Sequence, residues 1–183
     1  MADQCVFLDR DKTLIDDPGY LSDPSAVHLL PGVDRALQSL SEAGFRLVVV
    51  TNQSAVARGL VTEEGLERIH KELRRQLLER GIDLDAIYYC PFHPDGTVEE
   101  YARESMDRKP QPGMLLRAAR ELKIDLAQSW MVGDSARDVE AGQRAGCRTV
   151  MVRGLAVEQP EGAPARETKH METLPDEGNQ ADF

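Results

Sequence analysis

This sequence has few cysteines, few aromatic residues and no long apolar run. Aromatic side chains make up 5% of its 183 residues, and its three cysteines, Cys5, Cys90 and Cys147, are scattered along the chain. An odd number of dispersed cysteines indicates buried, reduced thiols rather than a disulfide framework. No stretch approaches the length of a membrane span, and the polar start "MADQ" is not followed by the apolar core of a leader peptide. We therefore expect a cytoplasmic protein with no membrane partner.

Positive charge is also scarce, because 22 Lys and Arg face 32 Asp and Glu and the formal net charge is -10. Such an excess of negative charge disfavours nucleic acid and anionic membranes as partners. A phosphorylated small molecule is compatible with it only if the site gathers its own cations or a metal ion. The length predicts one domain, residues 1–154, followed by an irregular tail rich in Pro and Glu over 155–183. We expect the protein to be a monomer.

Short apolar runs alternate with segments of helical spacing. The sequence predicts strands at 6–8, 45–50 and 86–90, and further strands within 130–134 and 147–152. Helices are expected after Pro31, between Thr62 and Gly81, after Pro112, and over 136–145. This alternation is typical of an α/β fold whose mostly parallel sheet is covered on both faces. Ligands of such sheets bind beyond the carboxyl ends of the strands.

Polar residues follow three of the expected strands directly. Asp9 follows the first strand, Thr51 and Asn52 the second, and Asp134 the fourth, so we expect them to converge on one edge of the sheet. Asp9 and Asp11 are two residues apart, and on an extended backbone they point the same way. One carboxylate can then act as a nucleophile while the other moves a proton. Oxygen ligands of this kind suit Mg²⁺.

A basic pair could complete such a site. Lys109, beside Arg108, can supply the positive charge that a phosphoryl transition state needs. Taken singly, "DRDK" at 9–12 is more typical of a solvated turn, and "GDSARD" at 133–138 of a helix start with an aspartate cap. Their joint occurrence, in this order and at strand ends, favours phosphoryl transfer.

Four stretches carry a family resemblance. "FLDRDKTL", "VVVTNQSAVARG", "RKPQPGM" and "MVGDSARD" resemble motifs one to four of the haloacid dehalogenase (HAD) superfamily of aspartate-nucleophile phosphatases. More narrowly, "TNQSAVARG", "IYYCPFHP" and "RKPQPGMLL" resemble the D-glycero-D-manno-heptose 1,7-bisphosphate phosphatases and the related histidinol-phosphate phosphatases. The resemblance covers residues from about 5 to 153. It implies a Rossmann-like three-layer sandwich without a large cap domain.

The same resemblance implies a Mg²⁺-dependent phosphomonoesterase that forms an aspartyl phosphate. The expected substrate is a small phosphorylated sugar, first of all heptose 1,7-bisphosphate, which would lose its 7-phosphate. Histidinol phosphate and a general range of sugar phosphates are alternatives. A different class of function, a catalytically silent relative that serves as a binding module, also stays open.

The two opening aspartates allow two assignments. With Asp9 as the nucleophile, Asp11 is the general acid and base, as in the phosphatases of the superfamily. With Asp11 as the nucleophile, "DKT" would resemble the phosphorylated motif of P-type ATPases. Asp9 is favoured, because it abuts the strand directly and the chain lacks the membrane spans that a pump requires.

Carried over position by position, the resemblance implies that Asp9 is the nucleophile and a Mg²⁺ ligand. Asp11 would serve in proton transfer and bind the metal through its backbone carbonyl, and Asp134 would be the remaining protein ligand. Asp138 is expected to support rather than ligate. Substrate contacts are expected from Asp16, Gly19, Tyr20, Thr51, Asn52, Gln53, Ser54, Arg108 and Lys109.

Two positions near the expected site depart from the family pattern. The family usually has Gly where this chain has Lys12, and commonly Lys where it has Ser135. We expect Lys12 to be a solvent-facing side chain at a position whose φ any residue can adopt. Ser135 removes one substrate contact that relatives have.

The loop over 91–107 departs further. Members of the family with zinc use four Cys or His ligands, and of those positions this chain keeps Cys90 alone. Since a structural zinc site needs four ligands, we expect no zinc. The loop should instead be held by apolar packing of Phe92, and by an ion pair of Asp107 with Arg108 or by backbone hydrogen bonds.

Overall fold

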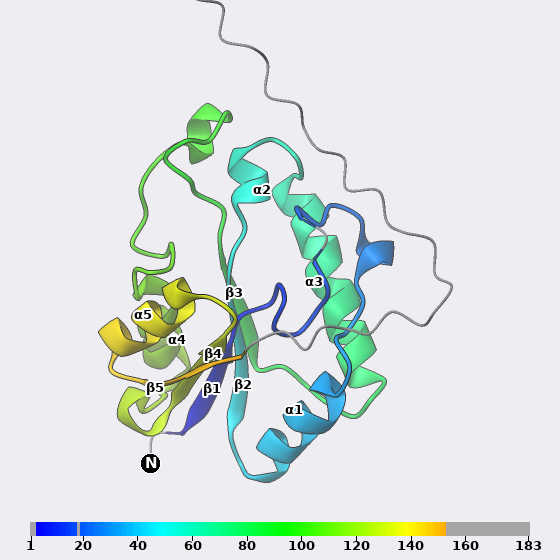
Figure 1. Cartoon of the computed structure of the whole chain (residues 1–183), viewed down its shortest axis with the longest axis vertical. Helices are drawn as coiled ribbons and strands as arrows, with labels where there is room; N and C mark the ends of the chain where they lie inside the picture. Colours follow the sequence, from blue (N-terminus) through cyan, green and yellow to red (C-terminus); the bar gives the residue numbers. More distant parts are fainter. Residues whose placement is uncertain (1–2, 18, 153–183) are drawn as a thin grey trace, which may run out of the picture.

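A computed structural model describes residues 3–17 and 19–152 of the chain. Within this part the strands form one sheet in the order β3-β2-β1-β4-β5, and every neighbouring pair is parallel (Figure 1). The strands are β1 (Cys5–Leu8), β2 (Arg46–Asn52), β3 (Ala86–Cys90), β4 (Trp130–Gly133) and β5 (Arg148–Met151). The predicted α/β class is confirmed. The predicted boundary at residue 154 and the tail over 155–183 lie outside the described residues.

Helices alternate with the strands and cover both faces of the sheet. In Figure 1, α1 and α3 lie on one side and α4 and α5 on the other, which is the predicted three-layer sandwich. The helices are α1 (Val33–Glu42), α2 (Ser54–Ala57), α3 (Glu63–Leu78), α4 (Gly113–Leu122) and α5 (Ala136–Ala145). Short 3₁₀ helices, labelled η1 to η3, span Pro24–Ala26, Glu99–Tyr101 and Leu126–Gln128. Among these elements none forms a separate cap domain, as the resemblance implied.

Alternate residues of the strands supply two cores. One set packs with buried side chains of α1 and α3, and it comprises Val6, Leu8, Leu47 and Val49. The other set packs with buried side chains of α4 and α5, and it comprises Cys5, Phe7, Val48, Val50 and Met131. Strands that are buried on both faces need almost continuous apolar sequence, which is why runs such as "LVVV" mark them.

Local signals fix where the helices begin. The Thr62 hydroxyl accepts a hydrogen bond from the Gly65 N–H at 3.1 Å, so the predicted N-cap of α3 is confirmed. At the start of α5, the N–H of Ser135 donates to the Asp138 carboxylate at 3.0 Å. This second cap holds Asp138 close to the end of β4.

The strand order places a topological switch point between β1 and β4. The chain leaves β1 for β2 and β3 on one side and returns to β4 on the other side of β1. In parallel sheets ligands bind at such a switch point. The Asp9 N–H donates to the Val132 carbonyl at 2.9 Å, so Asp9 lies level with the end of β4. Thr51 and Asn52 form the last two residues of β2 rather than following it.

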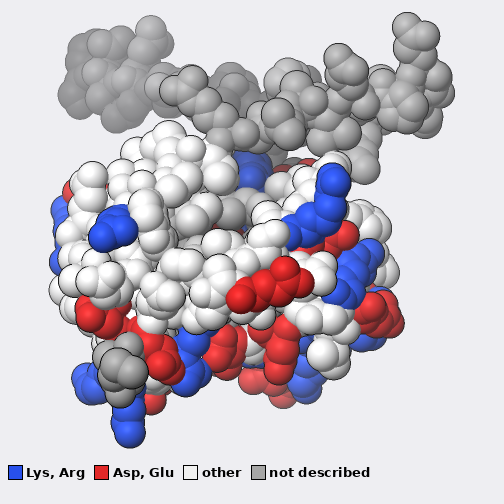
Figure 2. All heavy atoms as spheres, turned by 90° about the horizontal axis from the view of Figure 1, so that it is seen from below, with Lys and Arg blue, Asp and Glu red and all other residues white. Residues whose placement is uncertain are grey.

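Charge is mixed on the surface drawn in Figure 2. Acidic and basic side chains of the described residues lie interspersed there, around a broad area of uncharged residues. Across residues 3–17 and 19–152, no helix has the length and hydropathy needed to cross a membrane.

Candidate active site

A cavity of about 340 Å³ opens at the carboxyl ends of β1, β2 and β4. Most of the residues predicted for the site line it, namely Asp9, Asp11, Gly19, Tyr20, Asn52, Gln53, Ser54, Arg108, Lys109 and Asp134. Thr51 and Asp16 are not among the lining residues in the described part of the chain. The strand ends therefore bring together side chains that are up to 125 positions apart, from Asp9 to Asp134.

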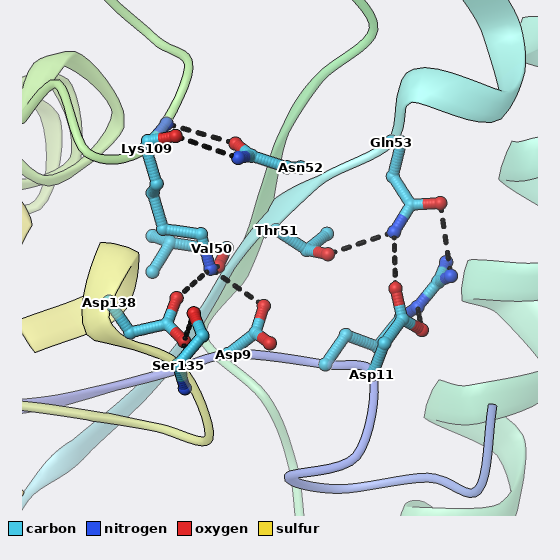
Figure 3. A network of polar contacts seen from close by, with 10 residues as sticks. Asp9, Asp11, Val50, Thr51, Asn52, Gln53, Lys109, Ser135 and Asp138 are labelled. Atoms are coloured by element: carbon cyan, nitrogen blue, oxygen red, sulfur yellow. Dashed lines mark hydrogen bonds and ion pairs between the residues drawn. The ribbon is translucent and has the colours of Figure 1, made fainter. Parts of the chain in front are cut away.

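Asp9 is bonded to a buried lysine. The Nζ atom of Lys109 lies 2.6 Å from the Asp9 carboxylate, 2.6 Å from that of Asp138, and 2.8 Å from the Val50 carbonyl oxygen. Figure 3 shows the Lys109 side chain reaching between the two aspartates. Its exposed fraction is 3%, so water hardly weakens these contacts. One ammonium group thus contacts two carboxylates on the floor of the cavity and offsets part of their charge.

Burial also changes the protonation of Asp9. It raises the pKa of this carboxyl to about 6, although Lys109 opposes the shift, and the charges of Asp138 and Asp11 raise it further. Burial likewise raises the pKa of Asp134, with Asp138 adding to the effect. This corner of the protein therefore holds more negative charge than Lys109 alone balances, and a further cation would keep the carboxylates ionised.

The acidic residues fit a hard divalent cation. Asp9, Asp134 and Asp138 each offer one carboxylate oxygen, and these atoms lie within 4.8 Å of one another. Both oxygens of Asp138 already have partners, since one bonds Lys109 and the other accepts from the backbone and the hydroxyl of Ser135. Asp9 and Asp134 are thus better placed than Asp138 to bind an ion such as Mg²⁺.

A glycine lets Asp138 come this close. A Cβ atom on Gly133 would lie 2.4 Å from the Cβ and Cγ atoms of Asp138. Any other residue at the end of β4 would push Asp138 away from Lys109. In the "GD" pair, Gly133 thus allows Asp138 to pack closely against β4, and Asp134 is a candidate metal ligand.

Asp11 lies on the other part of the cavity floor, away from the lysine. One of its oxygens accepts from Nε of Arg10 at 2.7 Å, and the other accepts from Nε2 of Gln53 at 2.9 Å. The chain then turns back, because the Lys12 N–H donates to the Ile15 carbonyl at 2.8 Å. Asp9 and Asp11 both line the cavity, as their spacing predicts.

The residues at the end of β2 make contacts inside the protein. Asn52 forms two hydrogen bonds of 2.9 Å with the backbone of Lys109, donating to its carbonyl and accepting from its N–H (Figure 3). The hydroxyl of Thr51, which is fully buried, accepts from Gln53 at 2.8 Å. Asn52 therefore fixes the segment that carries Lys109, and Thr51 fixes Gln53.

The segment after the turn over residues 11–15 forms one wall of the cavity. Gly19 has φ +106° and Tyr20 has φ +53°, and half of the Tyr20 side chain is exposed. The guanidinium carbon of Arg58 lies 5.9 Å from the centre of the Tyr20 ring. Asp16, which was also predicted to contact substrate, donates its N–H to the His28 carbonyl at 2.9 Å.

Six charged or titratable residues line the cavity beyond those predicted, namely Arg10, Lys12, Asp17, Arg58, His93 and Arg137. Burial lowers the pKa of Arg108, and the like charges of Arg137 and Arg58 add to this effect. All three arginines line the cavity. We call Arg58, Arg108 and Arg137 the cationic rim. Burial lowers the pKa of the neighbouring His93, which favours its neutral ring. The sequence could have indicated Arg137 as a cavity residue, because it lies three residues after Asp134 in the first turn of an expected helix.

The prediction for the Lys12 backbone is wrong. Its φ is +59°, which lies in the left-handed region where residues other than glycine are strained. The turn that carries the chain from Asp11 to Ile15 imposes this conformation. The side chain is exposed, as predicted, but it also lines the cavity.

The loop after β3 is held by packing and polar contacts. Phe92 packs against the apolar cluster that includes Cys90 and Met114, which confirms the predicted apolar packing. Its ring also lies 4.0 Å from the guanidinium carbon of Arg103 and 6.0 Å from the Tyr101 ring. The ion pair of Asp107 with Arg108, which was one prediction, is wrong. Asp107 instead pairs with Arg117 of α4 at 2.8 Å, while Arg108 donates to the Phe92 carbonyl at 3.2 Å. The two neighbouring side chains diverge, one toward α4 and the other toward the cavity.

Known proteins resemble this chain in sequence. A family model described as "HAD-hyrolase-like" matches residues 106–176. D-glycero-beta-D-manno-heptose-1,7-bisphosphate 7-phosphatase of Yersinia pestis is 48% identical over 149 residues, which are 81% of this chain and 79% of that protein. The protein of the same name from Escherichia coli strain K12 is 47% identical over 149 residues, 81% of this chain and 78% of that protein.

Solved structures resemble it as well. A HAD-like protein from Mesorhizobium loti has a TM-score of 0.80 and 37% identity, and the match covers 87% of this chain and 77% of that one. D,D-heptose 1,7-bisphosphate phosphatase from B. bronchiseptica, complexed with magnesium and phosphate, has a TM-score of 0.73 and 37% identity over 81% of this chain and 79% of that one. Sequence and structure thus agree over about four fifths of the chain.

Proposed function

The chain belongs to the haloacid dehalogenase-like (HAD) phosphatases, and from that premise we propose that it is a D-glycero-β-D-manno-heptose 1,7-bisphosphate 7-phosphatase. It would hydrolyse the 7-phosphate ester and leave the 1-phosphate on the sugar. The observation that carries this proposal is the Asp9 carboxylate at the end of β1, bonded at 2.6 Å to Lys109 and close to Asp134. The identity of 48% to a relative of that name supports the substrate.

The first half of the reaction uses Asp9 as the nucleophile. A carboxylate oxygen of Asp9 attacks the phosphorus atom, and the bond from phosphorus to the sugar oxygen breaks. Protonated Asp11 gives its proton to the departing alkoxide, which leaves as the free hydroxyl. Lys109 stays beside the reacting oxygens and offsets the negative charge of the phosphoryl group in transfer.

The second half regenerates the enzyme. The Asp11 carboxylate takes a proton from a water molecule, and the resulting hydroxide attacks the phosphorus of the aspartyl phosphate. The acyl phosphate bond breaks, inorganic phosphate leaves, and Asp9 is free again as a carboxylate. Asp11 thus ends protonated and is ready for the next substrate.

HAD phosphatases generally use Mg²⁺, and the carboxylates here suit that ion. We assign Asp9, Asp134 and the backbone carbonyl of Asp11 as its protein ligands. When bound, Mg²⁺ would offset the charge of the phosphoryl oxygens and hold Asp9 ionised. Removal of the metal with a chelator should stop turnover, and Mg²⁺ in excess should restore it. Full turnover in the chelated protein would contradict the assignment of Asp134.

The cationic rim favours a substrate with a second phosphate. Its arginines lie at the wall of the cavity whose floor holds Asp9, so a bisphosphate can place one phosphate at each position. Histidinol phosphate carries an amine at its other end, and the rim would repel that positive charge.

A panel of substrates tests the proposal. Release of inorganic phosphate is measured with Mg²⁺ on both anomers of the heptose bisphosphate, on heptose 7-phosphate, on histidinol phosphate and on common sugar phosphates. We expect kcat/KM for one heptose bisphosphate anomer to exceed that of the other compounds by about 10²-fold, because a charge-assisted contact contributes about 1.5–3 kcal/mol. Phosphorus NMR of the product should show the phosphate that remains at C1.

The other outcomes separate the alternatives. Equal rates on all compounds would indicate a general phosphatase. A preference for histidinol phosphate would indicate a histidinol-phosphate phosphatase. No turnover of any phosphate ester with metal bound would leave the catalytically silent binding module. As a finer test, Arg137→Ala should raise KM for the bisphosphate about 10-fold and leave that for heptose 7-phosphate unchanged. Arg120→Ala, an exposed arginine of α4 outside the cavity lining, is the matched control.

We also propose that residues 1–154 form the catalytic domain and that the enzyme is a monomer in the cytoplasm, without a nucleic-acid or membrane partner. Cys5, Cys90 and Cys147 are buried and free, which suits a reducing compartment. Light scattering after size-exclusion chromatography tests the oligomeric state. The mass of a dimer at micromolar concentration would contradict the monomer.

A further inference from the structure

Arg10 lies between the two aspartates of the nucleophile loop and is almost fully buried, with an exposed fraction of 1%. Taking a guanidinium group out of water is costly unless its donors are all matched. Within the described part of the chain its one ion-pair partner is Asp11, whose side chain is 22% exposed. Packing alone does not explain why the charged group of Arg10 is buried here.

Each arm of the guanidinium group has a separate partner. Nε donates to Asp11 at 2.7 Å, Nη2 donates to the side-chain oxygen of Gln53 at 3.0 Å, and Nη1 lies 3.2 Å from Nε2 of His70 on α3. Because a guanidinium group is planar and can only donate, these three contacts fix its position. Arg10 thus joins the nucleophile loop to α3 and to the residue that precedes α2.

His70 can serve as the acceptor because it is neutral. Burial, together with the positive charges of Arg10 and Arg74, lowers its pKa to about 3. Since Arg10 donates, the ring proton of His70 must be on Nδ1. The ring also lies 5.5 Å from that of Tyr89, which limits its rotation.

Gln53 completes the arrangement around the carboxylate. Its Nε2 atom donates to the second oxygen of Asp11 at 2.9 Å and to Thr51 at 2.8 Å, while its oxygen accepts from Arg10 (Figure 3). Both oxygens of Asp11 are therefore held, one by Arg10 and one by Gln53. Two of about four lone-pair positions stay open for a proton or a water molecule.

We propose that Arg10, together with Gln53 and His70, is a positioning residue that holds the Asp11 carboxylate in the orientation for proton transfer. This rests on the proposed function, because it assigns Arg10 a part in the same reaction. In this proposal Arg10 acts through Asp11, which it contacts at 2.7 Å. The competing explanation is that Arg10 only ties the loop to α3.

A double-mutant cycle separates the two explanations. The kcat for a sugar phosphate is measured for wild type, Arg10→Met, Asp11→Asn and the double variant. If Arg10 acts through Asp11, Arg10→Met should lower kcat about 10²-fold in the wild type, as expected for a catalytic group displaced by about 1 Å. In the Asp11→Asn background the same change should cost less than about 3-fold, because the group that Arg10 positions is already lost. Binding of vanadate with Mg²⁺ should change little in all four proteins.

Equal losses in both backgrounds, or no loss in the wild type, would overturn the proposal. Failure of the proposed function is distinguishable, since the wild type itself would then not turn over. If Arg10→Met does not fold, Gln53→Leu in the same cycle tests the contact to the other oxygen and should show the same loss of additivity. Arg75→Met, at an exposed arginine of α3 that pairs with Glu72 at 2.7 Å, is the control and should leave kcat unchanged.

Discussion

The left-handed backbone at Lys12 allows a prediction whose sign can be worked out. A residue with a Cβ atom at φ +59° carries a strain of about 1–2 kcal/mol, which glycine avoids. Glycine, in turn, loses about 0.5–1 kcal/mol more backbone entropy on folding than alanine. At position 12, Gly should therefore be more stable than Ala by about 0.5–1 kcal/mol. Both variants remove the ammonium group, so its interactions with the acidic residues of the cavity cancel in the comparison.

The assay is urea unfolding of Lys12→Gly and Lys12→Ala, supported by thermal melts. For a chain of this length the difference corresponds to about 2 °C in Tm. Lys71, an exposed residue within α3, is the matched control. There the sign should reverse, with Gly less stable than Ala by about 1 kcal/mol. If Gly is the less stable variant at both positions, the left-handed conformation of Lys12 is refuted.

Two other predictions concern buried charge. The pKa of His70 is lowered to about 3, so the folded protein binds this proton more weakly than the unfolded chain, and stability is complete above about pH 6.5 and falls as the pH drops toward 3. Between pH 7.5 and 5 the free energy of unfolding should fall by about 2 kcal/mol for this reason. In His70→Leu, urea unfolding should not show this fall. If the variant kept the pH dependence of the wild type, the neutral His70 ring would be contradicted. Lys109→Met should cost about 3–5 kcal/mol at pH 8 without metal, because Asp9 and Asp138 lose the ammonium group 2.6 Å from each. The cost should shrink at pH 5, where protonation of Asp9 relieves the repulsion, and a cost that stays constant with pH would argue against the ion pairs.

Much of the fold follows from local pattern. The apolar runs at 45–50 and 86–90 and the Thr62 cap are signals between neighbours in the chain, and the structure has strands and a helix there. Because the strands are parallel, their ends meet, and this alone brings Asp9 and Asp134 together. The residues on the floor of the site could therefore be predicted from the sequence.

The walls of the site depend on contacts that local pattern does not encode. Asp107 pairs with Arg117 because α4 packs beside the loop, and no spacing rule in the sequence announces that contact. Arg58, Arg108 and Arg137 line one cavity only because three separate segments fold around it. The φ of Lys12 was missed for a different reason, since a lysine in the sequence gives no sign of a left-handed turn.

The central claim is that Asp9 forms a covalent bond to phosphorus, and rapid acid quench tests it most directly. Wild type and Asp11→Asn are mixed with the sugar bisphosphate and Mg²⁺ and quenched within milliseconds, and the peptides are analysed by mass spectrometry. We predict one phosphoryl group on Asp9 in the wild type. In Asp11→Asn the same group should both form and disappear more slowly, because Asp11 protonates the leaving alkoxide and also activates the water that breaks the acyl phosphate. Asp9→Asn should show neither the adduct nor turnover. A phosphoryl group on another residue, or wild-type turnover in Asp9→Asn, would contradict the account.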